Sequence, residues 1–142
     1  MKSILLVDDN QETIDLVKFI FTNNEQVRLD FASTSKEAIE LFNANHYHAC
    51  ILDVSLPDLT GYYLGQLIRT SCPEMPLAFL TNYDGELTKE NAALIQARFW
   101  AKGDVFGNPI TLKNLIVGMA SEEACGGERQ PIKMPDIIEE IS

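Results

Sequence analysis

The sequence has no long apolar run. Nothing in its 142 residues approaches the roughly 20 consecutive apolar residues that a membrane-spanning helix needs. The apolar stretch at residues 4–7 is ended by Asp8 and Asp9, far too early for a signal peptide. We therefore expect a cytoplasmic protein without a membrane segment.

Cysteine and basic residues are also scarce. The three cysteines are odd in number and lack metal-ligand spacing, and we expect Cys50, which lies in an apolar run, to be a reduced core residue. The chain has 11 Lys and Arg residues against 21 Asp and Glu residues, which gives a net charge of −10. This excess of acid argues against direct nucleic-acid binding, which needs a basic face, and it favours basic partners or bound cations.

What the sequence does contain is an alternation of apolar runs and helical patterns. The strand candidates are residues 3–8, 26–32, 48–53, 76–81 and 98–102, and four of them lack the polar alternation of half-exposed strands. The pattern predicts an α/β fold, a doubly wound five-stranded parallel sheet with helices on both faces. Because residues 125–127 read Cys-Gly-Gly, we expect one domain over 1–124 and a C-terminal tail or linker over 125–142.

Polar side chains close these apolar strands. They are Asp8, Asp9, Asp53, Thr81 and Lys102. The carboxyl ends of parallel strands meet at one edge of a sheet, where open α/β folds bind ligands. Three carboxylates brought together there repel one another, so they need shifted pKa values or a neutralising cation. Oxygen-only ligands point to a hard ion such as Mg²⁺.

Four stretches carry a family resemblance. They are ILLVDDN at residues 4–10, LDVSLPD at 52–58 followed by Gly61, FLT at 79–81 and FWAK at 99–102. In this order and spacing they make the chain resemble the receiver domain of bacterial two-component response regulators, similar to the single receiver of chemotaxis, over residues 1 to about 122. The resemblance implies a flavodoxin-like, three-layer α/β/α fold.

The resemblance also implies a reaction. Asp53 would be the phosphoacceptor, taking a phosphoryl group from a histidine kinase or phosphotransfer protein and catalysing its own phosphorylation and dephosphorylation. Asp8, Asp9, Asp53 and the main-chain carbonyl of Ser55 would hold Mg²⁺, which offsets the repulsion between two anionic reactants. Lys102 would contact Asp53 and then a phosphoryl oxygen.

Signalling would follow from a change of surface. The resemblance makes Thr81 and Phe99 the switch residues, with the Thr81 hydroxyl donating to a phosphoryl oxygen. The output would reach a downstream protein target that the sequence does not name. A homodimer through the fourth helix, fifth strand and fifth helix is a further expectation.

The lysine departs from the family pattern. The family usually has Lys-Pro after the fifth strand, whereas here Gly103 follows Lys102 and the nearest proline pair is Asn108-Pro109. Lys102 stands 102 − 81 = 21 positions after Thr81, close to the usual gap, and Asn108 stands 108 − 81 = 27 positions after it. We therefore align on Lys102, which leaves residues 103–108 as a long, flexible loop and a helix beginning at Pro109.

Several residues in or near these motifs carry smaller predictions. Asp58 is expected to act as a turn former or helix cap. Asn10 is expected to cap the first helix and Ser35 the second. The bulky ring of Tyr83 is hypothesised to screen an acyl phosphate from water.

Two other classes of protein stay open. One is a Mg²⁺-dependent phosphohydrolase with an aspartyl nucleophile, although such enzymes usually carry a second acid where this chain has Ser55. The other is a phosphorylation-independent pseudo-receiver that acts as a protein-binding module, which would be favoured if no cation lay beside Asp53. The chain would be either a stand-alone regulator or a receiver excised from a longer protein.

Overall fold

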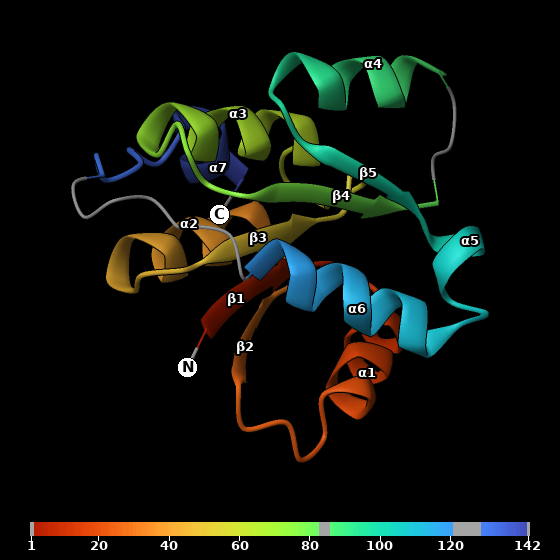
Figure 1. The fold of residues 1–142 in the computed structure, drawn as a ribbon. Helices are drawn as coiled ribbons and strands as arrows, with labels where there is room; N and C mark the ends of the chain where they lie inside the picture. The colour runs from red at the N-terminus through yellow and green to blue at the C-terminus, as the bar shows by residue number, and fades with distance from the viewer. Residues whose placement is uncertain (1, 83–85, 121–128, 142) are drawn as a thin grey trace.

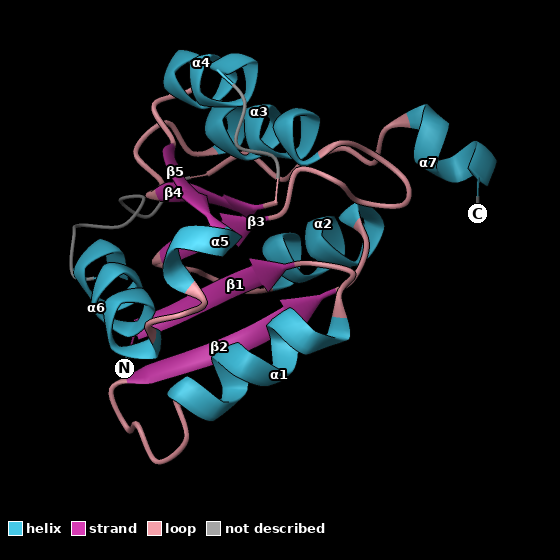
Figure 2. Cartoon of the chain, turned by 90° about the vertical axis from the view of Figure 1, so that its right-hand side faces the viewer, coloured by secondary structure: helices cyan, strands magenta, loops and turns pink. Residues whose placement is uncertain are grey.

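The computed structural model describes residues 2–82, 86–120 and 129–141. Within them the chain forms one parallel sheet of five strands in the order β2-β1-β3-β4-β5 (Figures 1 and 2). The strands are β1 (Lys2–Val7), β2 (Val27–Ala32), β3 (Ala49–Leu52), β4 (Leu77–Thr81) and β5 (Arg98–Ala101). The predicted doubly wound fold is confirmed, and each strand lies within the range expected from its apolar run or one residue outside it.

Burial explains why the strands were recognisable. All residues of β3 and β4 are buried, as their unbroken apolar runs predicted, because helices cover both faces of the sheet. β2 is only partly buried, which agrees with its alternating sequence and its place at the edge of the sheet. The sheet is therefore the rigid frame on which the polar strand ends are mounted.

Helices form a layer on each side of this sheet. The helices are α1 (Gln11–Ile20), α2 (Ser35–Ala44), α3 (Gly61–Ser71), α4 (Glu86–Leu94), α5 (Lys102–Val105), α6 (Pro109–Ala120) and α7 (Asp136–Ile141). One apolar core includes buried side chains of α2, α3 and α4, and the other joins α1 and α6 to the opposite face. Figure 1 shows α3 and α4 on one side of the sheet and α1 and α6 on the other. No helix of the described residues is long and apolar enough to cross a membrane.

Local capping agrees with the sequence in most places. The Asn10 side chain accepts a hydrogen bond from the Glu12 amide and begins α1. The predicted Ser35 cap is wrong by one residue, because Thr34 caps α2 by accepting from the Glu37 amide and Ser35 is the first helical residue. The helix expected at Pro109 is confirmed.

The segment after β5 differs from the expected flexible loop. Residues 102–105 form the short helix α5, in which the Phe106 amide donates to the Lys102 carbonyl at 2.9 Å. Val105 is buried in the core beside α6, and this apolar contact holds the turn in place in spite of Gly103 and Gly107. Lys102 thus stands at the start of a helical turn, directly after the strand.

Strand register decides which polar residues meet. Val7 pairs with Leu52, so Asp8 and Asp53 follow at the same level on adjacent strands. The Asp53 amide donates to the Val7 carbonyl at 2.8 Å, which extends the ladder by one residue. β1 and β3 are also the strands between which the chain order reverses, the position where open α/β sheets form a binding crevice.

The C-terminal residues 129–141 return to the body of the protein. They lie against α2 and α3 and end in α7. Tyr83 and residues 121–128 lie outside the described residues, so the Tyr83 hypothesis and the domain boundary at residue 124 stay predictions.

Candidate phosphoacceptor and metal site

Three carboxylates gather at the carboxyl edge of the sheet. Asp8 is 1% exposed and Asp53 is 6% exposed, whereas Asp9 is exposed to solvent. One carboxylate oxygen from each of the three lies within 4.8 Å of the others. The convergence expected from the strand ends is therefore present in the fold.

A buried lysine lies beside these acids. The Lys102 ammonium, on a residue that is 3% exposed, is 2.8 Å from Asp8 Oδ2 and 3.5 Å from Asp53 Oδ2. Its 2.8 Å contact with Asp8 Oδ2 is the shorter of these two ion pairs. The other oxygen, Asp8 Oδ1, accepts from the Asn10 amide at 2.9 Å. One cation is thus shared between two buried anions.

The environment of Asp53 opposes its charge. Burial raises the pKa of the Asp53 carboxyl above its usual range, and the nearby Asp8 raises it further. Lys102 and a hydrogen bond with the Thr81 hydroxyl lower this pKa but do not cancel the rise. A further positive charge at this site would therefore be favourable.

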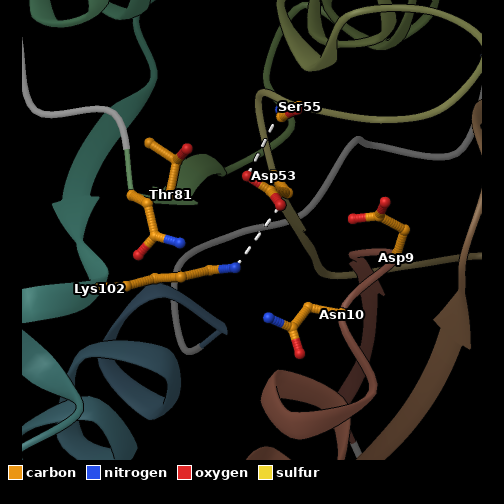
Figure 3. A pocket seen from close by; sticks show the side chains of 7 residues that line it. Asp9, Asn10, Asp53, Ser55, Thr81 and Lys102 are labelled. Atoms are coloured by element: carbon orange, nitrogen blue, oxygen red, sulfur yellow. Dashed lines mark hydrogen bonds and ion pairs between the residues drawn. The ribbon is translucent and has the colours of Figure 1, made fainter.

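These groups surround an open cavity of about 370 Å³. Its walls carry Asp9, Asn10, Asp53, Ser55, Thr81, Asn82 and Lys102. In Figure 3 the side chain of Asp53 lies between Ser55 and Lys102. Asp9 lies to the right of Asp53 in this view and Lys102 to the left, with Asn10 below. The Ser55 amide donates to Asp53 Oδ1 at 3.4 Å, which tethers the loop after β3 to the carboxylate.

Two lining residues were not among the predicted site residues. Asn10 was predicted only as a helix cap, and Asn82 was not singled out. Asn10 directly follows Asp9, and Asn82 directly follows Thr81. Both would have been found if the residue after each polar strand end had been included among the candidates. Their amide groups add neutral hydrogen-bonding capacity to a site otherwise made of charges.

The alternative alignment on Asn108 places its side chain elsewhere. Asn108 is exposed, and its side-chain oxygen accepts from the Thr111 amide at 3.3 Å, at the start of α6. It does not line the cavity that contains Lys102. Within the described residues the cation beside Asp53 is therefore Lys102.

The loop that carries Ser55 is held at both ends. Gly61 begins α3 so close to β3 that a Cβ there would lie 1.9 Å from the Asp53 carbonyl oxygen. Asp58 accepts from the amides of Ser35 at 2.9 Å and Lys36 at 3.0 Å, which fixes the loop to the first turn of α2. Asp58 is thus a helix cap, as expected, but for a helix that precedes it by more than 20 residues.

Hydrogen bonding also sets the charge of Asp58. Partial burial acts to raise its pKa, but hydrogen bonds from the amides of Ser35, Lys36 and Leu59 outweigh burial. The pKa of Asp58 is therefore lowered below its ordinary value of 3.8. Its negative charge also lies at the positive end of α2.

The predicted switch residues occupy adjacent strands. Thr81 is fully buried at the end of β4, and Phe99 is half-buried on β5. The Lys89 ammonium of α4 lies 5.9 Å from the centre of the Phe99 ring, a cation–π contact. Phe99 therefore connects the fifth strand to α4.

The donor set suits a hard divalent cation. The cluster offers carboxylate oxygens from Asp8, Asp9 and Asp53, and two of these residues, Asp8 and Asp53, are buried. Mg²⁺ prefers such oxygen ligands and keeps part of its water shell, for which the open cavity leaves room. The residues present therefore fit the ion that the sequence predicts.

The sequence also matches a known family. A model of the response regulator receiver domain matches residues 4–99. The chain belongs to this family. It is a receiver domain of two-component response regulators, as its motifs predicted, and the match ends three residues before Lys102.

Curated relatives match through part of their length. The regulatory protein VanR of Enterococcus faecium is 35% identical over 94 residues, which cover 66% of this chain and 40% of VanR. The autoinducer 1 sensor kinase/phosphatase LuxN of Vibrio harveyi is 31% identical over 84 residues, which cover 59% of this chain and 10% of LuxN. This chain thus spans 40% or less of the length of these two relatives.

Solved structures share the fold. A CheY-like receiver domain protein from Methanospirillum hungatei superposes with a TM-score of 0.76 at 24% identity, covering 84% of this chain and 94% of that chain. The response regulator TrrA of Thermotoga maritima, solved in complex with Mg²⁺-BeF, gives a TM-score of 0.72 at 25% identity, with coverage of 84% and 99%.

Proposed function

We propose that this receiver takes a phosphoryl group onto Asp53 in a Mg²⁺-dependent reaction and signals by a change of its interaction surface. The observation that carries the proposal is the position of the Asp53 carboxylate, which lines an open cavity within 4.8 Å of two other acids and 3.5 Å from the Lys102 ammonium. A phosphorylation-independent pseudo-receiver is not favoured, because a cation does lie beside Asp53.

The reaction is a transfer between two proteins. A carboxylate oxygen of Asp53 forms a bond to phosphorus while the bond from phosphorus to an imidazole nitrogen of the donor breaks. The donor would be a phosphohistidine on a histidine kinase or a phosphotransfer protein, and the freed imidazole nitrogen takes up a proton. Asp53 becomes an acyl phosphate, whose later hydrolysis restores the carboxylate.

The side chains around Asp53 would divide the remaining work. Asp8, Asp9, Asp53 and the Ser55 carbonyl would hold Mg²⁺, which supplies charge neutralisation for two anionic reactants when it is bound. Lys102 would move its contact from Asp53 to a phosphoryl oxygen as negative charge accumulates there. These roles are supported by the burial of Lys102 and by the raised pKa of Asp53.

Signalling would begin at Thr81. Its hydroxyl would donate to a phosphoryl oxygen and draw the end of β4 inward, and Phe99 would change its packing against α4. The surface affected is that of α4, β5 and α6, through which a homodimer or a downstream protein would bind. Size-exclusion chromatography with light scattering, with and without beryllofluoride, would measure whether the dimer forms.

Beryllofluoride with Mg²⁺ tests the site without a kinase. Because this complex mimics a phosphoryl group on a carboxylate, it should raise the thermal unfolding temperature of the wild type, as any ligand specific for the folded state does. Asp53→Asn should remove the shift, whereas Asp104→Asn, which changes an acid outside the cavity, should retain it. A shift of equal size in Asp53→Asn would overturn the proposal.

A further inference from the structure

The segment from Arg129 to Ile138 is attached to the body by its main chain. The Asn43 side-chain amide of α2 makes a two-point clamp on Ile132, accepting from its amide at 2.8 Å and donating to its carbonyl at 2.9 Å. Two residues earlier, the Gln130 amide donates to the Ser71 carbonyl at 3.3 Å, and the Ser71 hydroxyl donates to the Gln130 carbonyl. An extended segment is thus hydrogen-bonded through alternate residues, the pattern by which proteins bind peptides.

Side chains of the segment complete the apolar core. Ile132 is 7% exposed and Ile138 is 1% exposed, and both belong to the same buried cluster as Phe42 of α2. The guanidinium group of Arg129 lies 4.6 Å from the centre of the Phe42 ring. The neighbouring Ile137, by contrast, is 51% exposed. The segment therefore presents one apolar face to α2 and α3 and another face to solvent.

This contact lies outside the part of the chain that defines the family. The family match ends at residue 99, and the TrrA structure is covered over 99% of its length by 84% of this chain. The charge of the region also differs from the phosphorylation site, since the clamp uses neutral amides and a hydroxyl. The contact is thus an addition to the receiver, separate from the chemistry at Asp53.

We propose that the surface between the C-terminal ends of α2 and α3, called here the α2–α3 groove, is a peptide-binding site whose resident ligand is residues 129–138 of the same chain. Main-chain clamping by Asn43 and Ser71 sets the register, and burial of Ile132 and Ile138 supplies the affinity. While the segment is bound, this face of the receiver is closed to other proteins. When the segment leaves, an apolar surface is opened that accepts the same sequence from a second copy.

Trypsin measures the docked state in the full-length chain. Residues 121–128 contain no Lys or Arg, so Arg129 and Lys133 are the tryptic sites after α6, and cleavage there requires local release of the segment. Ile138→Asp places an unpaired charge in an apolar site and should raise the cleavage rate about tenfold or more. Ile137→Asp is the matched control and should be cleaved at the wild-type rate. Intact mass under reducing conditions reports the fragment that ends at Arg129.

A second variant guards against a simple folding defect. Asn43→Ala removes both clamping hydrogen bonds from an exposed position of α2, so the core of the receiver is unchanged. It should raise the cleavage rate several-fold, while Glu40→Ala, exposed on the same helix, should not. Equal rates in all four variants and the wild type would overturn the proposal, as would a wild type cleaved as fast as the free peptide.

A peptide in trans tests whether the groove is a binding site. A fluorescein-labelled peptide of residues 129–141 should bind the Ile138→Asp protein, whose groove is vacated, and should not bind the wild type, whose groove is filled. The same peptide carrying the Ile138→Asp change should bind neither. Fluorescence anisotropy that shows binding to neither protein, or equal binding to both, would contradict the proposal.

Discussion

At the scale of single residues, Lys102 supplies the positive charge beside the buried acids of the site. Its ammonium is buried between two carboxylates, so its removal leaves two close anions without a cation. Loss of one partner from a buried ion pair costs roughly 3–5 kcal/mol of unfolding free energy. We therefore expect the stability of the metal-free protein and its rate of phosphorylation to depend on the same side chain.

Replacing Lys102 tests whether the family's lysine corresponds to Lys102 or to the position of Asn108. Lys102→Ala should slow phosphorylation by acetyl phosphate at least about tenfold, since one charge contact to the phosphoryl group is worth 1.4 kcal/mol or more. Asn108→Ala, at the alternative alignment position, should leave the rate within twofold of the wild type. The measurement is the initial rate of phosphoprotein formation. Equal loss in both variants would leave Lys102 without its proposed role.

Asp58 gives a prediction about pH. Its folded-state pKa is lowered, so its contribution to stability is complete above its ordinary pKa of 3.8 and is lost as the pH falls from there through the folded pKa. Asp58→Ala should therefore cost about 1–2 kcal/mol at pH 7 and less below pH 4. Glu90→Ala, exposed on α4, should change stability by less than about 0.5 kcal/mol. Urea unfolding at pH 7 and at pH 3 measures the cost of the Asp58→Ala substitution. A cost at pH 3 as large as that at pH 7 would contradict the prediction.

At this scale the sequence located the acids but not every partner. Asp8, Asp9 and Asp53 were predictable because each ends a strand, and parallel strand ends must meet. The contact from Asp58 to Ser35 and Lys36 was not predictable, because its distance along the chain follows from the packing of the loop on α2. Local patterns carry no information about such a contact.

At the scale of elements, α3 is placed by a close approach that only glycine permits. A side chain at Gly61 would meet the main chain of Asp53 and Val54, and backbone atoms cannot move aside cheaply. The first turn of α3 therefore fixes the distance between the helix and the loop that follows Asp53, the proposed phosphoacceptor. Gly61 therefore links the position of α3 to the position of the loop at the site.

Substitution of this glycine should disturb both stability and metal binding. Gly61→Ala should lower the unfolding free energy by about 1–3 kcal/mol, the usual cost of overpacking, and should weaken Mg²⁺ binding. Gly103→Ala is the control, because a Cβ there meets nothing within 4 Å and Ala favours the α5 turn, so stability should be equal or slightly higher. Chemical unfolding and Mg²⁺ titration calorimetry test both. A neutral Gly61→Ala would mean that the close approach can relax.

The elements also show what periodicity can and cannot predict. The five strands were predictable because continuous apolar runs of this length require burial on both faces. α5 was not, because its turn is stabilised by the single buried side chain of Val105 and its two neighbouring glycines indicated a loop. An element of four residues is held by its tertiary contacts and carries almost no pattern of its own.

At the scale of the whole molecule, two faces of the receiver are expected to have different roles. Phe99 and α4 lie on the side expected to respond to phosphorylation, whereas the α2–α3 groove is covered by the chain's own C-terminal segment. The fold class, the five parallel strands and the strand-end site were accessible from sequence. The docking of residues 129–138 was not, because an extended segment has no periodicity that states which surface it will cover. The site at the strand ends was thus predictable from the sequence, whereas the contact of the C-terminal segment with the α2–α3 groove was not.

Above all, we propose that Asp53 is a phosphoacceptor. The most direct measurement is the intact mass of the protein after incubation with Mg²⁺ and acetyl phosphate, with Asp53→Asn as the control and a sample containing EDTA in place of Mg²⁺. The account predicts a single phosphate adduct on the wild type with Mg²⁺, and none on Asp53→Asn or in EDTA. No adduct on a folded wild type, or an equal adduct on Asp53→Asn, would contradict it.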